Sequence, residues 1–275
     1  KPEYLVATGV CIQKDDGTLV DKFRERAMFP IHTVSGRIIG FGGRTLRSDY
    51  KERNIGKYVN SPQTEVYDKK TTLYGIYFAK SEIARRDRCI LVEGYLDVLS
   101  MHQLGITNVV ASSGTSLTVE QVSLIRKFTE NVTIMYDGDA AGIHAAERGI
   151  GLCLKGGLNV RVVLIPDGDD PDSFARKHTL EEVKSFIEEN ERDFISYRTD
   201  QLIGDAGSDP VRRSNLVNEI AGTLALIPDQ VKRAMYVQDV STKFSIDESL
   251  VYAKINDAVR AMREEERKEE MRRQR

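Results

Sequence analysis

The fold of this chain is decided by residues 89–98, which read CILVEGYLDV. Four apolar residues in a row, followed by a charged residue and a glycine, predict a strand buried on both faces that stops at Glu93. Apolar residues then recur at helical spacing, so a helix is expected over 95–104. The stretch therefore predicts a strand–helix unit with a carboxylate at its turn.

The same alternation of strand and helix continues on the C-terminal side of this unit. Further strands are expected at 108–112, 132–136 and 159–165, and further helices at 118–128 and 140–154. Thr118 is expected to cap the first of these helices, and Gly156-Gly157 to end the second. Nearly continuous apolar strands separated by helices predict a parallel sheet with helices on both faces.

Different patterns precede and follow this α/β unit. A hairpin is expected from strands at 27–31 and 38–41, followed by an exposed loop over 47–57. Helical patterns occupy 180–189, 191–202, 211–225, 228–244 and 249–263, and the charged tail 264–275 is either a frayed helix end or a linker. We therefore expect a mixed α/β subdomain at 1–87, the sheet at 88–178 and a helical bundle at 179–275.

Charge is unevenly distributed, although the net charge is only −2. Residues 1–88 hold 17 Lys and Arg against 11 Asp and Glu, whereas residues 89–190 hold 8 against 15. A basic block beside an acidic one suits an enzyme that handles a polyanion with a metal site, and equally suits an ordinary soluble chain. The three cysteines form no Cys-x-x-Cys pair, so no zinc site or disulfide framework is expected, and a reducing cytosol is the expected compartment. No apolar run is long enough to span a membrane.

Acidic residues follow three of the predicted strands. Glu93 ends the first strand, Asp137 and Asp139 follow the third, and Asp170 and Asp172 follow the fourth. The carboxyl ends of parallel strands meet at one edge of a sheet, so these side chains are expected to converge there. Asp97 lies one helical turn after Glu93 and is expected to face the same edge.

Crowded carboxylates repel one another unless cations lie between them. Mg²⁺ is the expected ion because it takes oxygen ligands and keeps waters for a substrate phosphate, and Mn²⁺ is expected to substitute. Taken alone, Asp137-Gly138-Asp139 is a common turn and Asp170-Pro171-Asp172 a common helix start. Their combination at one sheet edge favours the metal site. Whether Glu93 binds metal directly or accepts a proton stays open.

These acids also carry a family resemblance. EGYLD at 93–97 followed by YDGD at 136–139 resembles the Toprim signature of primases, topoisomerases and some nucleases. From about Val6 to Tyr197 the chain resembles the RNA polymerase core of bacterial DnaG-type primases. The matching segments are FRER (23–26), MFPI (28–31), GFGGR (40–44), KYVNSP (57–62), LYG (73–75) and DGDDPD (167–172).

The resemblance implies template-directed synthesis of short RNA primers from ribonucleoside triphosphates on single-stranded DNA, with an RNA–DNA duplex as product. By motif it implies Glu93, Asp137 and Asp139 as the central catalytic and metal-binding acids, with Asp97, Asp170 and Asp172 as further metal-site acids. It also implies a groove that contacts template or nucleotide, formed by Arg44, Lys57, Tyr58, Asn60 and Lys69.

Three groups are left open by the residues themselves. Arg24 and Arg26 alternate on a predicted strand, so they face either the groove or solvent. Tyr58 suits a core position when taken alone, and its polar neighbours favour a surface role in base stacking. The Gly114-Thr115-Ser116 segment is either a helix cap or a substrate contact.

The resemblance also implies what this segment lacks. The family's zinc-binding domain and helicase-binding domain show no motif here, so we expect an excised, monomeric fragment that meets the replicative helicase only through a part not present. Its expected place is the bacterial replication fork. The alternatives are a topoisomerase or nuclease with the same metal site, and a non-catalytic nucleic-acid-binding module.

Overall fold

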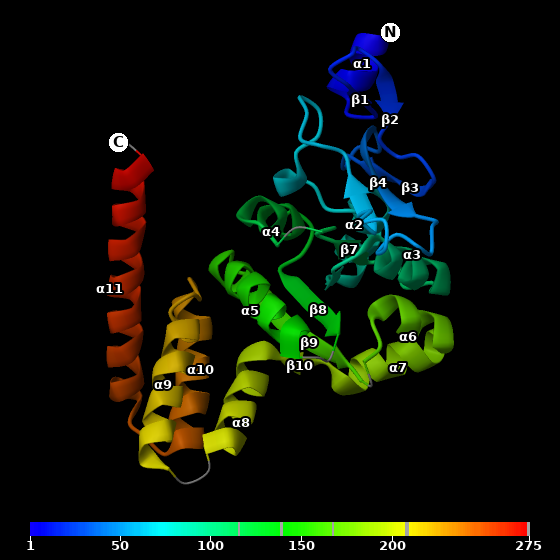
Figure 1. The fold of residues 1–275 in the computed structure, drawn as a ribbon. Helices are drawn as coiled ribbons and strands as arrows, with labels where there is room; N and C mark the ends of the chain where they lie inside the picture. The colour runs from blue at the N-terminus through cyan, green and yellow to red at the C-terminus, as the bar shows by residue number, and fades with distance from the viewer. Residues whose placement is uncertain (115, 138–139, 167, 207–208, 274–275) are drawn as a thin grey trace.

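A five-stranded sheet organises the structure, a computed structural model that describes residues 1–114, 116–137, 140–166, 168–206 and 209–273 (Figure 1). Its strand order is β10-β9-β8-β6-β7. The strands are β6 (Cys89–Val92), β7 (Val109–Ala111), β8 (Asn131–Asp137), β9 (Asn159–Ile165) and β10 (Arg192–Asp193). The first four are mutually parallel, as predicted, while β10 pairs antiparallel with β9 at the edge.

Helices cover both faces of this sheet, which confirms the predicted fold class. One face carries α3 (Tyr95–Leu104), α6 (Pro171–Lys177) and α7 (Leu180–Asn190), and the other carries α2 (Ile76–Arg86), α4 (Val119–Arg126) and α5 (Ala140–Lys155). Successive residues of β6 alternate between the two faces: Ile90 packs in the same cluster as Met101 of α3, and Leu91 in the same cluster as Ile83 of α2. This alternation is why the strand is apolar throughout.

Local signals set the helix ends where the sequence predicts them. Thr118 Oγ1 accepts a hydrogen bond from the Gln121 backbone amide at 3.1 Å, and Gln121 Oε1 accepts one from the Thr118 backbone amide at 3.2 Å. This reciprocal pair satisfies amides at the start of α4. Helix α5 ends before Gly156-Gly157, where Gly157 adopts a φ of +78° that favours glycine.

A second, smaller sheet precedes the first. It consists of β3 (Arg26–His32), β4 (Ile38–Thr45) and β5 (Tyr58–Asn60), all antiparallel, so the predicted hairpin is confirmed. The chain reaches it through α1 (Pro2–Ala7) and the pair β1 (Cys11–Gln13) and β2 (Leu19–Asp21). The exposed loop connects β4 to β5, and the chain leaves the sheet after β5 through residues 61–68 and the short helix η1 (Lys69–Thr71). Phe29 and Ile31 of β3 share a buried cluster with α3, so the two sheets are packed together.

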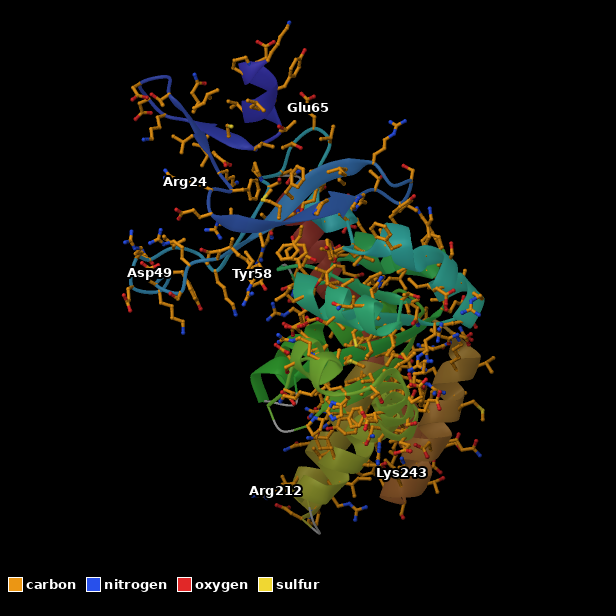
Figure 2. The ribbon with its side chains drawn as sticks, turned by 90° about the vertical axis from the view of Figure 1, so that its right-hand side faces the viewer. Arg24, Asp49, Tyr58, Glu65, Arg212 and Lys243 are labelled. Carbon is orange, nitrogen blue, oxygen red and sulfur yellow. The ribbon has the colours of Figure 1, made fainter. Side chains whose placement is uncertain are left out.

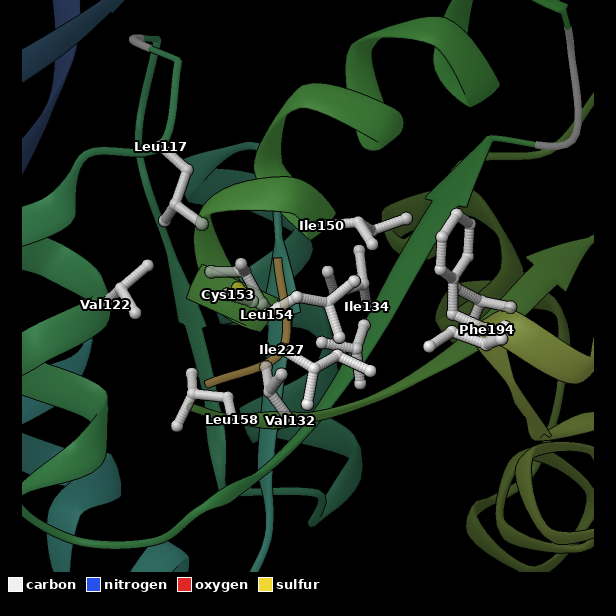
Figure 3. Packing of buried hydrophobic residues seen from close by; sticks show 14 of the residues in the cluster. Leu117, Val122, Val132, Ile134, Ile150, Cys153, Leu154, Leu158, Phe194 and Ile227 are labelled. Atoms are coloured by element: carbon white, nitrogen blue, oxygen red, sulfur yellow. The ribbon is translucent and has the colours of Figure 1, made fainter. Parts of the chain in front are cut away.

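The C-terminal region is helical and packs on the sheet. It comprises α8 (Phe194–Ala206), α9 (Pro210–Leu224), α10 (Gln230–Phe244) and α11 (Glu248–Arg273). Ile227, between α9 and α10, lies in one cluster with Cys153, Leu154 and Val132 of the α/β unit (Figure 3). The helices therefore share a core with the sheet.

Two boundaries differ from the prediction. The helix expected at 191–202 is preceded by β10, because Glu191 Oε2 lies 3.0 Å from Arg161 Nη1 and Glu191 Oε1 lies 2.7 Å from Arg88 Nη2, which hold this segment against the sheet edge. The helix expected to stop near 263 continues to Arg273. Within the described ranges, no helix has the length and apolar character needed to cross a bilayer.

Candidate metal centre and nucleic-acid groove

The strand ends converge as the sequence predicts. Strands β6 and β8 are neighbours; Glu93 directly follows β6, and Asp137 is the last residue of β8, paired with Ile165 at the end of β9. The structure thus brings the backbone positions of Glu93 and Asp137 to one edge, which we name the acid edge together with Asp97, Asp170 and Asp172. Asp139 and the side chain of Asp137 lie outside the described part of the chain.

The turn after β6 is held by a carboxylate. Asp97, in the first turn of α3, is 9% exposed, and its Oδ2 accepts a hydrogen bond from the Gly94 amide at 2.7 Å. The carbonyl of Glu93 accepts one from the Ser113 amide at 3.1 Å, while the Glu93 side chain is exposed. Asp97 therefore fixes the backbone that presents Glu93, in addition to any contact with metal.

Asp170 begins a helix, as its motif alone suggests. Its Oδ1 accepts a hydrogen bond from the Ser173 amide at 2.7 Å and caps α6. Asp172 is 7% exposed; its Oδ1 accepts from Ser100 Oγ of α3 at 2.5 Å, and its Oδ2 lies 2.9 Å from Arg176 Nη2. Both oxygens of Asp172 therefore have protein partners, and the residue joins α6 to α3.

The donor set at this edge suits a hard cation. Carboxylate oxygens come from the end of β6, from α3 and from the start of α6, and such ligands are those Mg²⁺ and Mn²⁺ take. Among the described side chains no group of three or more His, Cys, Asp or Glu lies close enough to hold an ion. That search leaves out the Asp137 and Asp139 carboxylates.

Two of the residues predicted for the groove, Arg44 of β4 and Tyr58 of β5, lie on the face of the small sheet that is turned toward α3. Arg44 and Tyr58 are directly opposite in the β4–β5 register, so they share one face of the small sheet. Gly42 has the same parity as Arg44, and a Cβ built on it would lie 2.6 Å from the ring of Tyr95 in α3. Tyr58 is 38% exposed and lies at the boundary between the small sheet and the body of the molecule (Figure 2).

Electrostatics connect this face with the acids. Burial raises the pKa of the Tyr58 hydroxyl, the Arg44 guanidinium opposes the shift, and the carboxylates of Asp97, Asp172 and Asp170 add to it. Lys57 Nζ lies 6.0 Å from the Tyr58 ring centroid. Cations, an aromatic ring and carboxylates therefore share one space, which is what binding of a nucleotide phosphate, base and metal requires.

Asn60 joins the two sheets. Its Oδ1 accepts a hydrogen bond from the Tyr95 hydroxyl at 2.9 Å, and its Nδ2 donates to the Ser113 carbonyl at 3.4 Å. The Tyr95 ring stacks on Phe29 with centroids 5.1 Å apart. We name Asn60, Tyr95, Ser113 and Phe29 the seam. The sequence analysis did not assign a role of its own to Tyr95. The one hint in the sequence is Gly42, because the absence of a side chain there leaves room for the Tyr95 ring.

Arg24 and Arg26 do not share a strand, so that expectation is wrong. Arg24 lies in an exposed turn before β3 and, in Figure 2, farther from the body than Tyr58. Arg26 begins β3 on the opposite face from Arg44, the face on which a Gly43 Cβ would meet it. Its Nη1 donates to the carbonyls of Gly56 at 2.9 Å, Gly43 at 3.2 Å and Lys57 at 3.4 Å, and so holds the loop that carries Lys57.

Lys69 lies in η1, and its backbone carbonyl accepts a hydrogen bond from Gln121 Nε2 at 3.1 Å. Burial lowers the pKa of Lys22, and the charge of the Lys69 ammonium adds to this shift. Of the Gly114-Thr115-Ser116 segment, Thr115 lies outside the described residues.

Comparison with solved structures decides the family. A DNA primase domain from Pseudomonas aeruginosa is 31% identical with a TM-score of 0.82, covering 93% of this chain and 79% of that one. A DnaG primase catalytic domain bound to ssDNA is 34% identical with a TM-score of 0.80, covering 90% and 78%. The chain belongs to the DnaG-type DNA primase family.

Family models and curated relatives agree with this assignment. The primase-family matches are "DNA primase catalytic core, N-terminal domain" over 1–80, "Toprim-like" over 90–175 and "DnaB-helicase binding domain of primase" over 195–249. The DNA primase of Clostridium acetobutylicum is 38% identical over 250 residues, which is 90% of this chain and 40% of that protein. The chain thus spans about two-fifths of the curated relatives it matches.

The last of these family models corrects one expectation. The sequence analysis finds no helicase-binding motif in the chain, and the match over 195–249 contradicts that. The helices there carry only a general amphipathic pattern, which gives no helicase signal to reasoning from spacing. A Toprim-type primase core also implies use of a divalent metal ion.

Proposed function

We propose that this chain is a primase catalytic core that synthesises short RNA primers from ribonucleoside triphosphates on a single-stranded DNA template, using Mg²⁺ or Mn²⁺. The observation that carries the proposal is the face formed by Arg44 and Tyr58 opposite the acid edge. A nuclease needs the acids and a water, and a topoisomerase also needs a nucleophilic tyrosine, whereas a polymerising enzyme must hold a triphosphate and a template base. Its place is the bacterial replication fork in the cytoplasm.

The chemistry is transfer of a nucleotidyl group. The primer 3′-oxygen forms a bond to the α-phosphorus, the α–β bridging P–O bond breaks, pyrophosphate leaves, and the hydroxyl proton passes to a base or water. Glu93, Asp137 and Asp139 would hold the metal, which would lower the pKa of the attacking hydroxyl and stabilise the leaving pyrophosphate. Arg44 and Lys57 bind phosphates of the nucleotide or template, and Tyr58 stacks on a base.

The test is incubation of the chain with single-stranded DNA, labelled ribonucleoside triphosphates and Mg²⁺ or Mn²⁺. We expect short RNA products that depend on template and metal. Asp137→Ala and Asp139→Ala are expected to abolish both the products and the binding of Mn²⁺ measured by paramagnetic relaxation. Unchanged Mn²⁺ binding in both variants would defeat the site assignment.

The competing functions give different outcomes in the same experiment. Cleavage of the DNA without nucleotide incorporation identifies a nuclease. Binding without turnover identifies a non-catalytic module. Arg44→Ala serves as a matched variant outside the acid edge, because it is expected to reduce synthesis while Mn²⁺ binding stays unchanged.

We further propose the replicative helicase, single-stranded DNA and the RNA–DNA product as partners of this chain, which acts as a monomer. The helicase match over 195–249 and the ssDNA-bound relative support the first two. We also propose that the functional divisions fall near residues 88 and 179, although the buried clusters run across both points.

A further inference from the structure

A pocket lies at the end of the five-stranded sheet opposite the acid edge, and we name it the basal pocket. It measures about 250 Å³ and is lined by residues at the starts of β6 and β7, at the end of α2 and on α7. Arg88 comes directly before β6, and Asn108 directly before β7. Glu93 follows the other end of β6, so the length of that strand separates the basal pocket from the acid edge. The small volume limits the occupant to a small molecule.

The lining includes a buried polar atom without a partner. Asn108 is 2% exposed, and its Nδ2 donates to the Arg88 carbonyl at 2.9 Å, which fixes the orientation of the amide. Its Oδ1 is buried and accepts no hydrogen bond from any residue in the described ranges. A buried acceptor that has lost its water is unfavourable, so a ligand that brings an N–H or O–H donor to this atom gains from the contact.

Three cations line the same pocket, namely Arg86 at the end of α2, Arg88, and Lys184 of α7. Two of them have acidic partners: Arg86 Nε donates to Glu82 Oε2 at 3.0 Å, and Arg88 Nη2 lies 2.7 Å from Glu191 Oε1. Lys184 forms no ion pair or hydrogen bond with the rest of the chain that the structure describes. Its ammonium is therefore available to an anion.

The charge around the pocket is only partly neutralised by the protein. Burial lowers the pKa of the Arg88 guanidinium, the Glu191 carboxylate opposes the shift, and the Arg161 guanidinium adds to it. Glu191 is shared, because its Oε2 also lies 3.0 Å from Arg161 Nη1. Glu188 is the one acid that lines the pocket, and its exposure to water screens its charge. An additional anion would therefore be stabilised here, and a phosphate suits guanidinium and ammonium donors.

The rest of the lining is apolar. Ile90, Ile106 and Ile187 line the pocket, and each is no more than 4% exposed. Apolar side chains beside an unpaired acceptor suit a flat ring that carries N–H groups at its edge, and the nearby cations suit a phosphate attached to it.

We propose that the basal pocket binds a nucleoside monophosphate, with its phosphate against Arg86 and Lys184 and an N–H of its base toward Asn108 Oδ1. This site goes beyond the proposed function, because it lies at the opposite end of the sheet from the acid edge. Its ligand is a second nucleotide, distinct from the substrate of primer synthesis.

The test is calorimetric titration of the whole chain with AMP, GMP, CMP and UMP in the presence of EDTA, which removes the divalent ions that would bring a nucleotide to the acid edge. We expect saturable binding of at least one of the four. Lys184→Ala is expected to weaken it by about fivefold or more, and Arg86→Gln by a smaller factor, because each removes a cation from the phosphate.

Two control variants locate the binding. Lys127→Ala removes an exposed lysine at the end of α4 that does not line the pocket, and Arg44→Ala weakens the groove of the small sheet. Both are expected to change the affinity by less than about twofold. Melting temperatures verify that every variant is folded.

Ligand chemistry tests Asn108 without altering a buried residue. Purine riboside 5′-monophosphate has the ring system and phosphate of AMP, and its base has no N–H donor. It is expected to bind roughly tenfold more weakly than the best of the four nucleotides, because Asn108 Oδ1 stays unpaired. Inorganic phosphate, which lacks the base, is expected to bind more weakly still.

Four outcomes overturn the proposal. The first is the absence of saturable binding, and the second is binding of inorganic phosphate as tight as that of the nucleotides, which would leave only an anion site. The third is loss of affinity in Arg44→Ala with Lys184→Ala unchanged, which would place the nucleotide in the groove. The fourth is equal loss in Lys184→Ala and Lys127→Ala. None of these measurements depends on primer synthesis, so a failure of the proposed function is seen separately.

Discussion

The acid edge and the groove face of the small sheet are built in different ways. The acid edge collects residues from the ends of separate elements, β6, β8, α3 and α6, and the parallel topology brings them together. The groove face is built by the pleat of two neighbouring antiparallel strands, on which Arg44 and Tyr58 share a face and Arg26 does not. Topology is therefore sufficient for the first region, whereas the second depends on strand pairing and on the seam that turns it toward the acids.

The largest expected effect comes from breaking the seam. Tyr95→Ala removes a ring that is 3% exposed and stacked on Phe29, and is expected to lower the free energy of unfolding by about 3–5 kcal/mol. Tyr95→Phe keeps the ring and loses only the hydrogen bond to Asn60, at a cost of about 1 kcal/mol. Denaturant unfolding measures both. Equal losses would mean that the hydroxyl, rather than the ring, joins the regions.

Within the acid edge, Glu93 and Asp172 are expected to differ. Glu93→Gln removes a charge from an exposed side chain and should reduce primer synthesis by roughly 100-fold to 1,000-fold with little change in melting temperature. Asp172→Asn weakens the link to Ser100 and Arg176 and should lower stability by about 1–3 kcal/mol. The opposite pattern would make Asp172 the metal ligand and Glu93 the structural residue.

At the start of the small sheet, Arg26 in β3 and Arg24 in the turn before it provide a matched pair. Arg26→Ala removes the donor that holds the carbonyls of residues 43, 56 and 57, and is expected to cost about 1–3 kcal/mol and to raise the KM for nucleotide. Arg24→Ala, in an exposed turn, should change stability by no more than about 0.5 kcal/mol. If Arg24→Ala has the larger effect on KM, the template passes over the outer face of this sheet.

The smallest expected effect is a pH dependence of folding stability caused by His102 of α3. Burial lowers the pKa of His102, and its hydrogen bond to the Val109 carbonyl opposes the shift. The folded state therefore holds His102 neutral, so stability is expected to fall as pH drops below about 6.5, where the unfolded chain gains the proton, and to level off below the folded pKa. His102→Gln should flatten this part of the stability profile measured by thermal unfolding. An unchanged profile would assign the slope to other groups.

Most of the sheet could be predicted from the spacing of apolar residues, and the parallel topology predicts that the backbone positions of Glu93 and Asp137 lie at one edge. The α2 helix also had a signal, since Ile76, Ala79 and Ile83 recur at helical spacing, but the sequence analysis did not identify it. The facing of Arg26 could not be predicted. Glu25 adopts a φ of +56° directly before β3, so the strand alternation does not extend back to Arg24.

Other features could not be predicted because they depend on partners that are distant in sequence. Asn60 resembles a groove residue, and only its contact with Tyr95, 35 positions away, reveals that it joins the two sheets. Strand β10 is two residues long, which is too short to show the alternation of apolar and polar residues, and it is defined by its pairing with β9. Asp170 and Asp172 could be predicted to lie at the acid edge, whereas the partners of their oxygens could not.

The long last helix has a consequence for amide hydrogen exchange. Helix α11 has 26 residues, about 39 Å, yet its buried side chains, Val251 and Ile255, lie in its first turns. Beyond Met262 the described residues are exposed, so their backbone hydrogen bonds open without loss of buried contacts. Protection against exchange should therefore fall along α11, from near-global values beside α9 to values typical of an isolated peptide helix at its far end.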